Sequence, residues 1–150
     1  MTQTRFVFSA GAAAHYRFPT HVNDLIMDRA EAETSEAFMV VLEPGEAPPL
    51  HVHDDTEQVF FVLEGAGTLQ IGSEPGQHFA VKVGDLVRIP PRTPHRIQCE
   101  GTERLVYLSV DCFVQGRPSA EPTWESHVRG ICKLNGWNFD EVAPQHKKGG

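Results

Sequence analysis

Short apolar runs separated by turn residues dominate the middle of this chain. The clearest are Ala37–Leu42 and Val59–Leu63, and each ends close to a glycine. Runs of this length, bounded by Gly, Pro, Asn and Asp, are typical of strands in antiparallel sheets. Similar runs predict further strands at residues 68–71, 79–83, 86–89, 95–99 and 105–111. The pattern therefore predicts an all-β barrel or sandwich.

The segments that flank this region differ from it. Residues 1–35 carry fewer regular signals, and we expect an arm that adds a strand to the barrel edge or to a neighbouring subunit. Residues 115–122 have the composition of a linker or lid. Thr123 then resembles a helix N-cap, and Asn135-Gly136 a helix stop. We expect this short amphipathic helix to dock on the barrel through Trp124.

These segments define one domain. A chain of 150 residues is near the common domain size. We divide it into an N-terminal arm (1–35), a barrel core (36–112), a linker with helical extension (113–142) and a flexible tail (143–150). His146 lies in the tail, where we expect no functional role.

Charge and composition exclude several classes of partner. The formal net charge of −7 argues against nucleic acid or an acidic membrane surface. No apolar run approaches the ~18 residues that a membrane span needs, and the N-terminus lacks the apolar core of a signal peptide. The cysteines, widely spaced and odd in number, indicate reduced thiols (Cys99, Cys112, Cys132). We expect a cytoplasmic protein.

Two glycine-anchored stretches hold the most informative polar residues. Residues 45–65 include His51 and His53, and residues 84–98 include His95. On a strand, two histidines in a His-x-His pattern point to one face. Imidazole suits Zn, Cu, Fe and Ni, so the pair can supply half of a coordination shell. Taken alone, the pair is equally compatible with a surface position that has no ligand role.

Both stretches resemble the two sequence motifs of the cupin superfamily. In the first, five residues separate Gly45 from His51, and the metal-carboxylate position, separated from Gly65 by six residues, holds Gln58. The second motif is matched by Gly84, Pro90 and His95, whereas Arg92 replaces its second glycine and Cys99 its asparagine. The resemblance covers roughly residues 37–112. It implies a double-stranded β-helix with one divalent metal ion inside the barrel.

Gln58 is the departure with chemical consequences. An amide oxygen coordinates a metal without adding charge, so with three imidazoles the site would keep the full charge of the ion. A more positive ion polarises a carbonyl more strongly. The neutral set therefore favours isomerase, lyase or cyclase chemistry over oxygen chemistry. Two alternatives stay open: Glu57 is the ligand, one residue out of register, or no metal binds and the polar cluster lines a small-molecule pocket.

Other polar residues on or beside the predicted strands are candidates for substrate contact. Glu57 could act as a general base or orient a histidine, and an inward arginine could hold a substrate carboxylate. If the C-terminal helix is a lid, Trp124 or His127 comes near the substrate. The remaining candidates on the barrel strands are Arg88, Arg92, Arg96, Tyr107 and Asp111.

The sequence thus predicts a homodimeric cupin barrel with a short C-terminal helix. We expect His51, His53, Gln58 and His95 to hold Zn, Mn, Ni or Fe, with a small oxygenated molecule as substrate. Among catalytic residues, only Glu57 and Arg92 are candidates. An Fe(II)-dependent dioxygenase and a non-catalytic barrel that binds or senses a small molecule are the alternative functions.

Overall fold

A computed structural model describes residues 3–144 of the chain. Nine strands form two antiparallel sheets in it. Their bounds are β1 Ala14–Phe18, β2 His21–Met27, β3 Ser35–Leu42, β4 Thr56–Glu64, β5 Ala66–Ile71, β6 Gln77–Lys82, β7 Leu86–Ile89, β8 His95–Glu100 and β9 Leu105–Phe113. The helices are α1 Trp124–Asn135 and α2 Phe139–Val142, and the 3-10 turns are η1 Ala10–Ala12 and η2 Arg29–Glu31.

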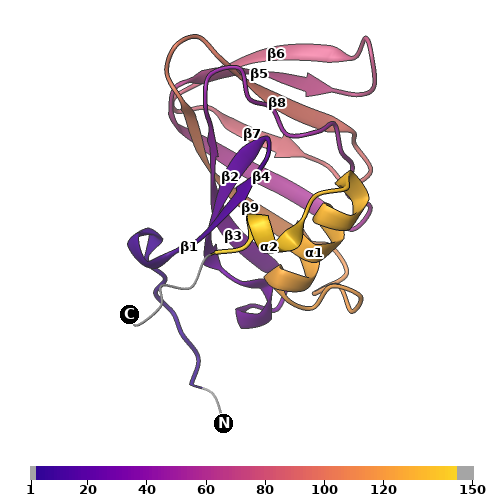
Figure 1. The fold of residues 1–150 in the computed structure, drawn as a ribbon. Coiled ribbons are helices and arrows are strands. Elements are labelled where there is room, and N and C mark those ends of the chain that lie inside the picture. The colour runs from indigo at the N-terminus through magenta and orange to yellow at the C-terminus, as the bar shows by residue number, and fades with distance from the viewer. Residues whose placement is uncertain (1–2, 145–150) are drawn as a thin grey trace.

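The two sheets face each other and enclose the core, with α1 and α2 at one end of the barrel (Figure 1). One sheet has the order β1-β2-β3-β9-β4-β7, and the other has the order β6-β5-β8. Strands adjacent in space are thus far apart in sequence, as in β3 beside β9 and β9 beside β4. This is the double-stranded β-helix that the sequence predicts.

Alternating apolar residues explain why these segments form strands. Along β3, every second residue is buried, and the inward set includes Phe38, Val40 and Leu42. A side-chain period of two places one face of each strand in the core and the other towards solvent. Gly65 makes the sharp turn between β4 and β5 at φ 77°, where a Cβ atom would collide with the backbone of Arg104.

The N-terminal arm contributes two strands to the barrel of its own chain. β1 and β2 form a hairpin, and β2 pairs with β3 along its edge. This pairing covers an edge of β3 that would otherwise be open. The inward residues of the β1–β2 hairpin include Phe18, His21 and Asn23, all of them buried.

The C-terminal helix packs on this side of the barrel. Thr123 caps α1 through a reciprocal capping box with Ser126, and Gly136 ends it in the left-handed conformation. The Trp124 ring is 1% exposed and lies against Phe38 and Tyr16. The helix therefore docks through Trp124, as expected. Residues 145–150, which include His146, lie outside the described residues.

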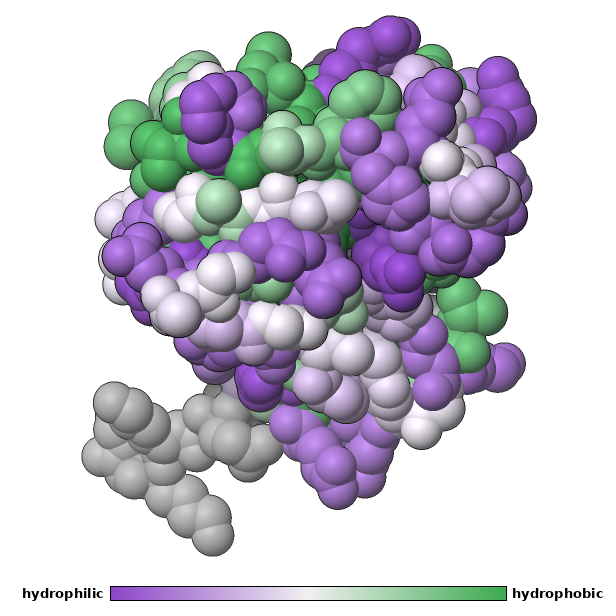
Figure 2. All heavy atoms as spheres, turned by 90° about the horizontal axis from the view of Figure 1, so that it is seen from above, coloured by the Kyte–Doolittle hydropathy of each residue, from purple (hydrophilic) through white to green (hydrophobic). Residues whose placement is uncertain are grey.

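Polar side chains cover most of the face seen in Figure 2, and apolar side chains gather along one part of its margin. Within residues 3–144, no helix is long and apolar enough to cross a membrane.

Candidate metal centre

Three histidines from different segments meet at the barrel interior. His51 and His53 lie in the loop between β3 and β4, and His95 is the first residue of β8. A nitrogen of each ring lies within 4.8 Å of a nitrogen of the other two. Tetrahedral zinc with Zn–N bonds of about 2.1 Å places its donors about 3.4 Å apart. The three ring nitrogens are therefore near enough to one another to be candidate ligands of one ion.

Backbone hydrogen bonds hold the two motifs together. The N–H of His51 donates to the carbonyl of His95 at 3.1 Å, and the N–H of His95 donates back at 2.9 Å. His51 thus forms only an isolated bridge, not the strand that the His-x-His pattern suggested. Pro48 and Pro49 precede it, and proline lacks the N–H that a longer ladder would need.

The rings are oriented by carbonyl oxygens. Nδ1 of His51 lies 2.8 Å from the carbonyl of Pro49, and Nδ1 of His95 lies 2.9 Å from that of Thr93. A carbonyl only accepts, so these Nδ1 atoms carry the proton in the neutral rings. The Nε2 lone pairs of His51 and His95 are then free to bind a metal ion.

Gln58 faces this cluster from β4. Its side chain is buried, with Oε1 2.9 Å from Nε2 of His95 and Nε2 donating to the Ser109 hydroxyl at 2.8 Å. With the proton of His95 on Nδ1, two lone pairs face each other between the amide and the imidazole. A cation between them would bind both, so the donor set fits a metal ion.

Burial keeps the histidines neutral. Burial, and then the nearby His51 and His95, lower the pKa of His53 to about 2. Burial, followed by His51, lowers the pKa of His95 to about 4, and burial also lowers that of His51. Neutral imidazole is the form that binds a metal ion, so no proton has to leave these rings at neutral pH.

Glu57 lies on the opposite face of β4 from Gln58. Its carboxylate accepts a hydrogen bond from Arg88 at 2.7 Å, and neither residue lines the cavity. Strand alternation is the reason, because adjacent residues point to opposite faces. The general-base role considered for Glu57, and the alternative in which it replaces Gln58, therefore have no support in the geometry.

Arg92 and Arg96 also lie outside the cavity lining. Arg92 is exposed, but its backbone N–H donates to the carbonyl of His53 at 2.6 Å. It adopts φ 61°, a left-handed conformation that explains the glycine of the family motif at this position. Arg96 donates to Gln70. Arg92 thus contacts the loop that carries His53, and Arg96 links β8 to β5.

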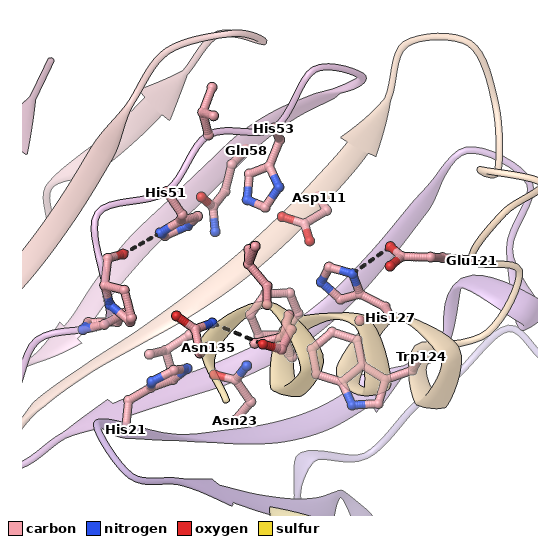
Figure 3. A pocket seen from close by; sticks show the side chains of 18 of the residues that line it. His21, Asn23, His51, His53, Gln58, Asp111, Glu121, Trp124, His127 and Asn135 are labelled. Carbon is pink, nitrogen blue, oxygen red and sulfur yellow. Dashed lines mark hydrogen bonds and ion pairs between the residues drawn. The ribbon is translucent and has the colours of Figure 1, made fainter. Parts of the chain in front are cut away.

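His51 and His53 line a cavity of about 350 Å³ between the barrel and α1. Figure 3 shows His51, His53 and Gln58 on one side and His127, Trp124 and Asn135 on the other, with Asp111 between them. A volume near the lower end of the usual range for ligand pockets suits a small molecule. Aromatic side chains line much of the wall: Phe38, Tyr107, Trp124 and Trp137.

Asp111 is a buried carboxyl group in this wall. Burial, and then the adjacent Glu36, raise the pKa of Asp111 well above its usual range. Burial would also raise the pKa of Glu36, but hydrogen bonds with Asp111 and Arg29 lower it overall. Arg29 donates to both oxygens of Glu36, at 2.7 and 2.9 Å. A hydrogen bond between two carboxyl groups requires a proton on one of them, and the opposite pKa shifts place it on Asp111 rather than on Glu36.

Unpaired buried polar atoms concentrate in this cavity. In the described part of the chain, three buried side-chain atoms lack a hydrogen-bond partner, and each belongs to a residue of the cavity lining: Asn23 Oδ1, Asp111 Oδ1 and Trp124 Nε1. A buried polar atom without a partner costs about 1–3 kcal/mol. A ligand with its own donors and acceptors would recover part of this cost.

Several cavity residues were not predicted from the sequence. His21 and Asn23 come from the arm, and Glu121 comes from the linker. The alternating pattern of His21, Asn23 and Leu25 was the available signal for a strand with a polar inner face. Nothing in the linker sequence pointed to Glu121. Tyr107, Asp111, Trp124 and His127, all of them candidates, do line the cavity.

The chain matches known proteins through its barrel. A family model described as a cupin domain matches residues 38–111. An uncharacterized protein of Methanocaldococcus jannaschii is 37% identical over 68 residues, which cover 45% of this chain and 52% of that protein. Quercetin 2,3-dioxygenase of Bacillus subtilis is 30% identical over 105 residues, or 68% of this chain and 30% of the enzyme. The matches thus span about half or less of these relatives.

The barrel also resembles solved structures. The structure of a predicted oxalate decarboxylase from Thermotoga maritima superposes with a TM-score of 0.64 at 18% identity. The superposition covers 72% of this chain and 99% of that one. At this level of identity the likeness concerns the fold. The family match, the two-sheet barrel and the converging histidines together show that this chain belongs to the cupin superfamily.

Proposed function

We propose that the protein is a small metalloenzyme that holds one divalent ion through His51, His53, His95 and Gln58. The observation that carries the proposal is the convergence of three neutral histidines and the Gln58 amide oxygen beside one cavity. A divalent ion bound there would act as a Lewis acid on a carbonyl or enol oxygen of a small molecule. Its charge would not be reduced by a carboxylate ligand, which favours isomerase, lyase or cyclase chemistry.

The protein residues would orient the substrate and keep water out. Phe38, Trp124 and Trp137 present apolar surface, and the unpaired Oδ1 of Asp111 would accept a hydrogen bond from a donor on the substrate. Tyr107 adds a phenol whose pKa is raised, first by burial and then by Asp111, so it stays protonated. The cavity thus combines a Lewis-acid end with a hydrogen-bonding wall.

The first experiment is elemental analysis of protein purified without added metal. We expect about one equivalent of a transition metal in the wild type and none in a His51→Ala/His53→Ala double variant. His95→Ala should lose the metal as well, because His95 joins both motifs and also faces Gln58. The control is His78→Ala, an exposed histidine on β6 that should leave the metal content unchanged. A wild type that takes up no metal on reconstitution would contradict the proposal.

A dioxygenase is the second candidate, because the match to quercetin 2,3-dioxygenase covers 68% of this chain. Iron-loaded protein would then consume O₂ with a flavonol such as quercetin. Zinc-loaded protein is the control and should not consume O₂. Oxygen uptake that depends on iron and on His95 would replace the Lewis-acid proposal. If iron-loaded protein consumes no O₂ with quercetin, the result would contradict this dioxygenase activity.

A further inference from the structure

A histidine–carboxylate pair lies across the cavity from the clustered histidines of the candidate metal centre. Nδ1 of His127, on α1, lies 2.9 Å from Oε1 of Glu121. Because a carboxylate accepts, Nδ1–H is the donor and Nε2 keeps its lone pair. The side of the ring that carries Nε2 is turned towards the cavity in Figure 3. A neutral imidazole held in this tautomer can accept a proton from a ligand.

Glu121 is fixed by a buried arginine. Nη1 of Arg29 donates to the backbone carbonyl of Glu121 at 2.9 Å and lies 3.9 Å from its carboxylate. Arg29 is 2% exposed and is itself held by both oxygens of Glu36. The hydrogen bond from His127 lowers the pKa of Glu121, so this carboxylate is ionised. The orientation of His127 therefore depends on a chain of contacts that reaches into the barrel core.

Gly130 makes room for this pair. It lies inside α1, where glycine is less favourable than alanine by about 1 kcal/mol. A Cβ atom at this position would collide with Oε2 of Glu121. The glycine thus lets the carboxylate lie against the helix, where it reaches His127. Gly130 therefore favours a positioning role for α1 in addition to its packing on the barrel.

We propose that the cavity binds a small aromatic or conjugated compound with an acidic hydroxyl, and that His127, oriented by Glu121, accepts the proton of that hydroxyl. The O–H bond breaks, an N–H bond forms at Nε2, and both bonding electrons stay on the ligand oxygen, so no oxidant is needed. The aromatic wall fits a flat ligand, and Glu121 balances the imidazolium charge. The inference rests on the proposed metal site, which anchors the ligand oxygen. His127, Glu121 and Gly130 all lie beyond the matched cupin region, residues 38–111.

4-Nitrocatechol, whose visible band reports ionisation of its hydroxyl, tests this inference with zinc-loaded full-length protein. Both tryptophans of the chain, Trp124 and Trp137, line the cavity, so quenching of their fluorescence reports its occupancy. We expect the wild type to bind and ionise the probe. His127→Gln and Glu121→Gln should keep their zinc but bind the probe at least about tenfold more weakly, through loss of a charge-assisted hydrogen bond. His78→Gln is the control for histidine replacement.

Gly130→Ala tests the positioning role. The added methyl group should displace the Glu121 carboxylate and weaken probe binding, whereas Lys133→Ala, on the exposed face of α1, should not. Imidazole ¹⁵N NMR gives a readout that general damage to the fold would not produce. We expect His127 as the Nδ1–H tautomer in the wild type and a mixture of tautomers in Glu121→Gln and Gly130→Ala. Circular dichroism confirms that each variant is folded.

The zinc content separates the two proposals. A wild type that takes up no zinc contradicts the metal site, and with it the inference that rests on that site. Zinc-loaded wild type that fails to bind or ionise the probe contradicts the proposed ligand class. Folded variants of His127 and Glu121 that bind it as tightly as the wild type contradict the role of the pair.

Discussion

At the residue scale, the site depends on which side chains are neutral. His51, His53, His95 and Gln58 bring no charge, and burial and then Glu36 raise the pKa of Asp111 beside them. The ionised groups, Arg29 and Glu36, pair with each other away from the cluster. A divalent ion would therefore meet no carboxylate charge in its first shell.

Replacing Gln58 by glutamate tests this charge argument. Gln58→Glu keeps the size of the side chain, and the Ser109 hydroxyl can donate to the new carboxylate instead of accepting. We expect zinc to bind about tenfold more tightly or better, equivalent to ~1.4 kcal/mol, because the ligand gains a full negative charge. Competition with a chromophoric chelator measures the affinity. Gln70→Glu is the control, a glutamine that lies outside the cavity lining. Weaker binding by Gln58→Glu would place Gln58 outside the coordination shell.

Buried histidines also predict how stability depends on pH. Burial, and then His51, lower the pKa of His21 to about 3 from an ordinary value of 6.5. Its contribution to stability is therefore complete above about pH 6.5 and declines as the pH falls towards 3, because the unfolded chain binds the proton first. For metal-free protein, we expect His21→Gln to reduce the slope of unfolding free energy against pH by up to ~1.4 kcal/mol per unit in that window.

Urea unfolding at a series of pH values between about 7 and 5 measures that slope. The other buried histidines also contribute to the slope, so the unfolding free energy of the variant should still depend on pH, but less steeply than that of the wild type. His15→Gln is the control, because His15 is exposed and pairs with Asp24 at the surface. Equal slopes in His21→Gln and the wild type would show that His21 titrates normally in the folded protein.

The motif spacing predicted which histidines converge, because the two glycine-anchored stretches fix the distance of each histidine from a turn of the barrel. It could not decide between Gln58 and Glu57, since a shift of one residue exchanges the two faces of a strand. The register of β4 against β9, which pairs Gln58 with Asp111, favours Gln58. Glu121 and Arg29 meet across 92 positions of sequence, and no local pattern encodes such a contact.

At the element scale, the cavity combines residues of the cupin match with residues from elements outside it. The β1–β2 hairpin brings His21 and Asn23, and α1 brings Trp124 and His127. Capping residues predicted α1 well, because the Thr123 and Gly136 signals are local. The hairpin was harder to predict because His21, Asn23 and Asp24 interrupt its apolar pattern. Two of these residues, His21 and Asn23, line the cavity.

Removing the N-cap of α1 should loosen this wall. Thr123→Ala deletes the hydroxyl that accepts from the N–H of Ser126, and we expect a loss of about 1 kcal/mol in unfolding free energy. Backbone amides of the first turn of α1 should also exchange hydrogen faster. Denaturant unfolding and hydrogen exchange measure the two effects, with Thr102→Ala in an exposed turn as the control. Unchanged exchange in α1 would show that Trp124 alone holds the helix in place.

At the scale of the whole molecule, the barrel exposes an apolar patch away from the cavity. Phe61 and Leu63 point outward from β4, and Leu86 on the edge strand β7 pairs in register with Phe61. These side chains are 41%, 42% and 66% exposed, respectively. An exposed edge strand beside apolar side chains favours association with another chain. The patch therefore offers a basis for the homodimer expected from the sequence.

We expect sedimentation velocity to show a dimer, and Phe61→Glu to convert it to a monomer, because burying a carboxylate against a second copy of the patch is unfavourable. Val114→Glu is the matched control, since Val114 is 58% exposed and lies outside the patch. Metal content and binding of 4-nitrocatechol should be the same in the monomeric variant, because every residue proposed to hold the metal or the probe comes from one chain. A Phe61→Glu protein that stays dimeric would move the interface elsewhere, and one that loses the metal would tie the site to assembly.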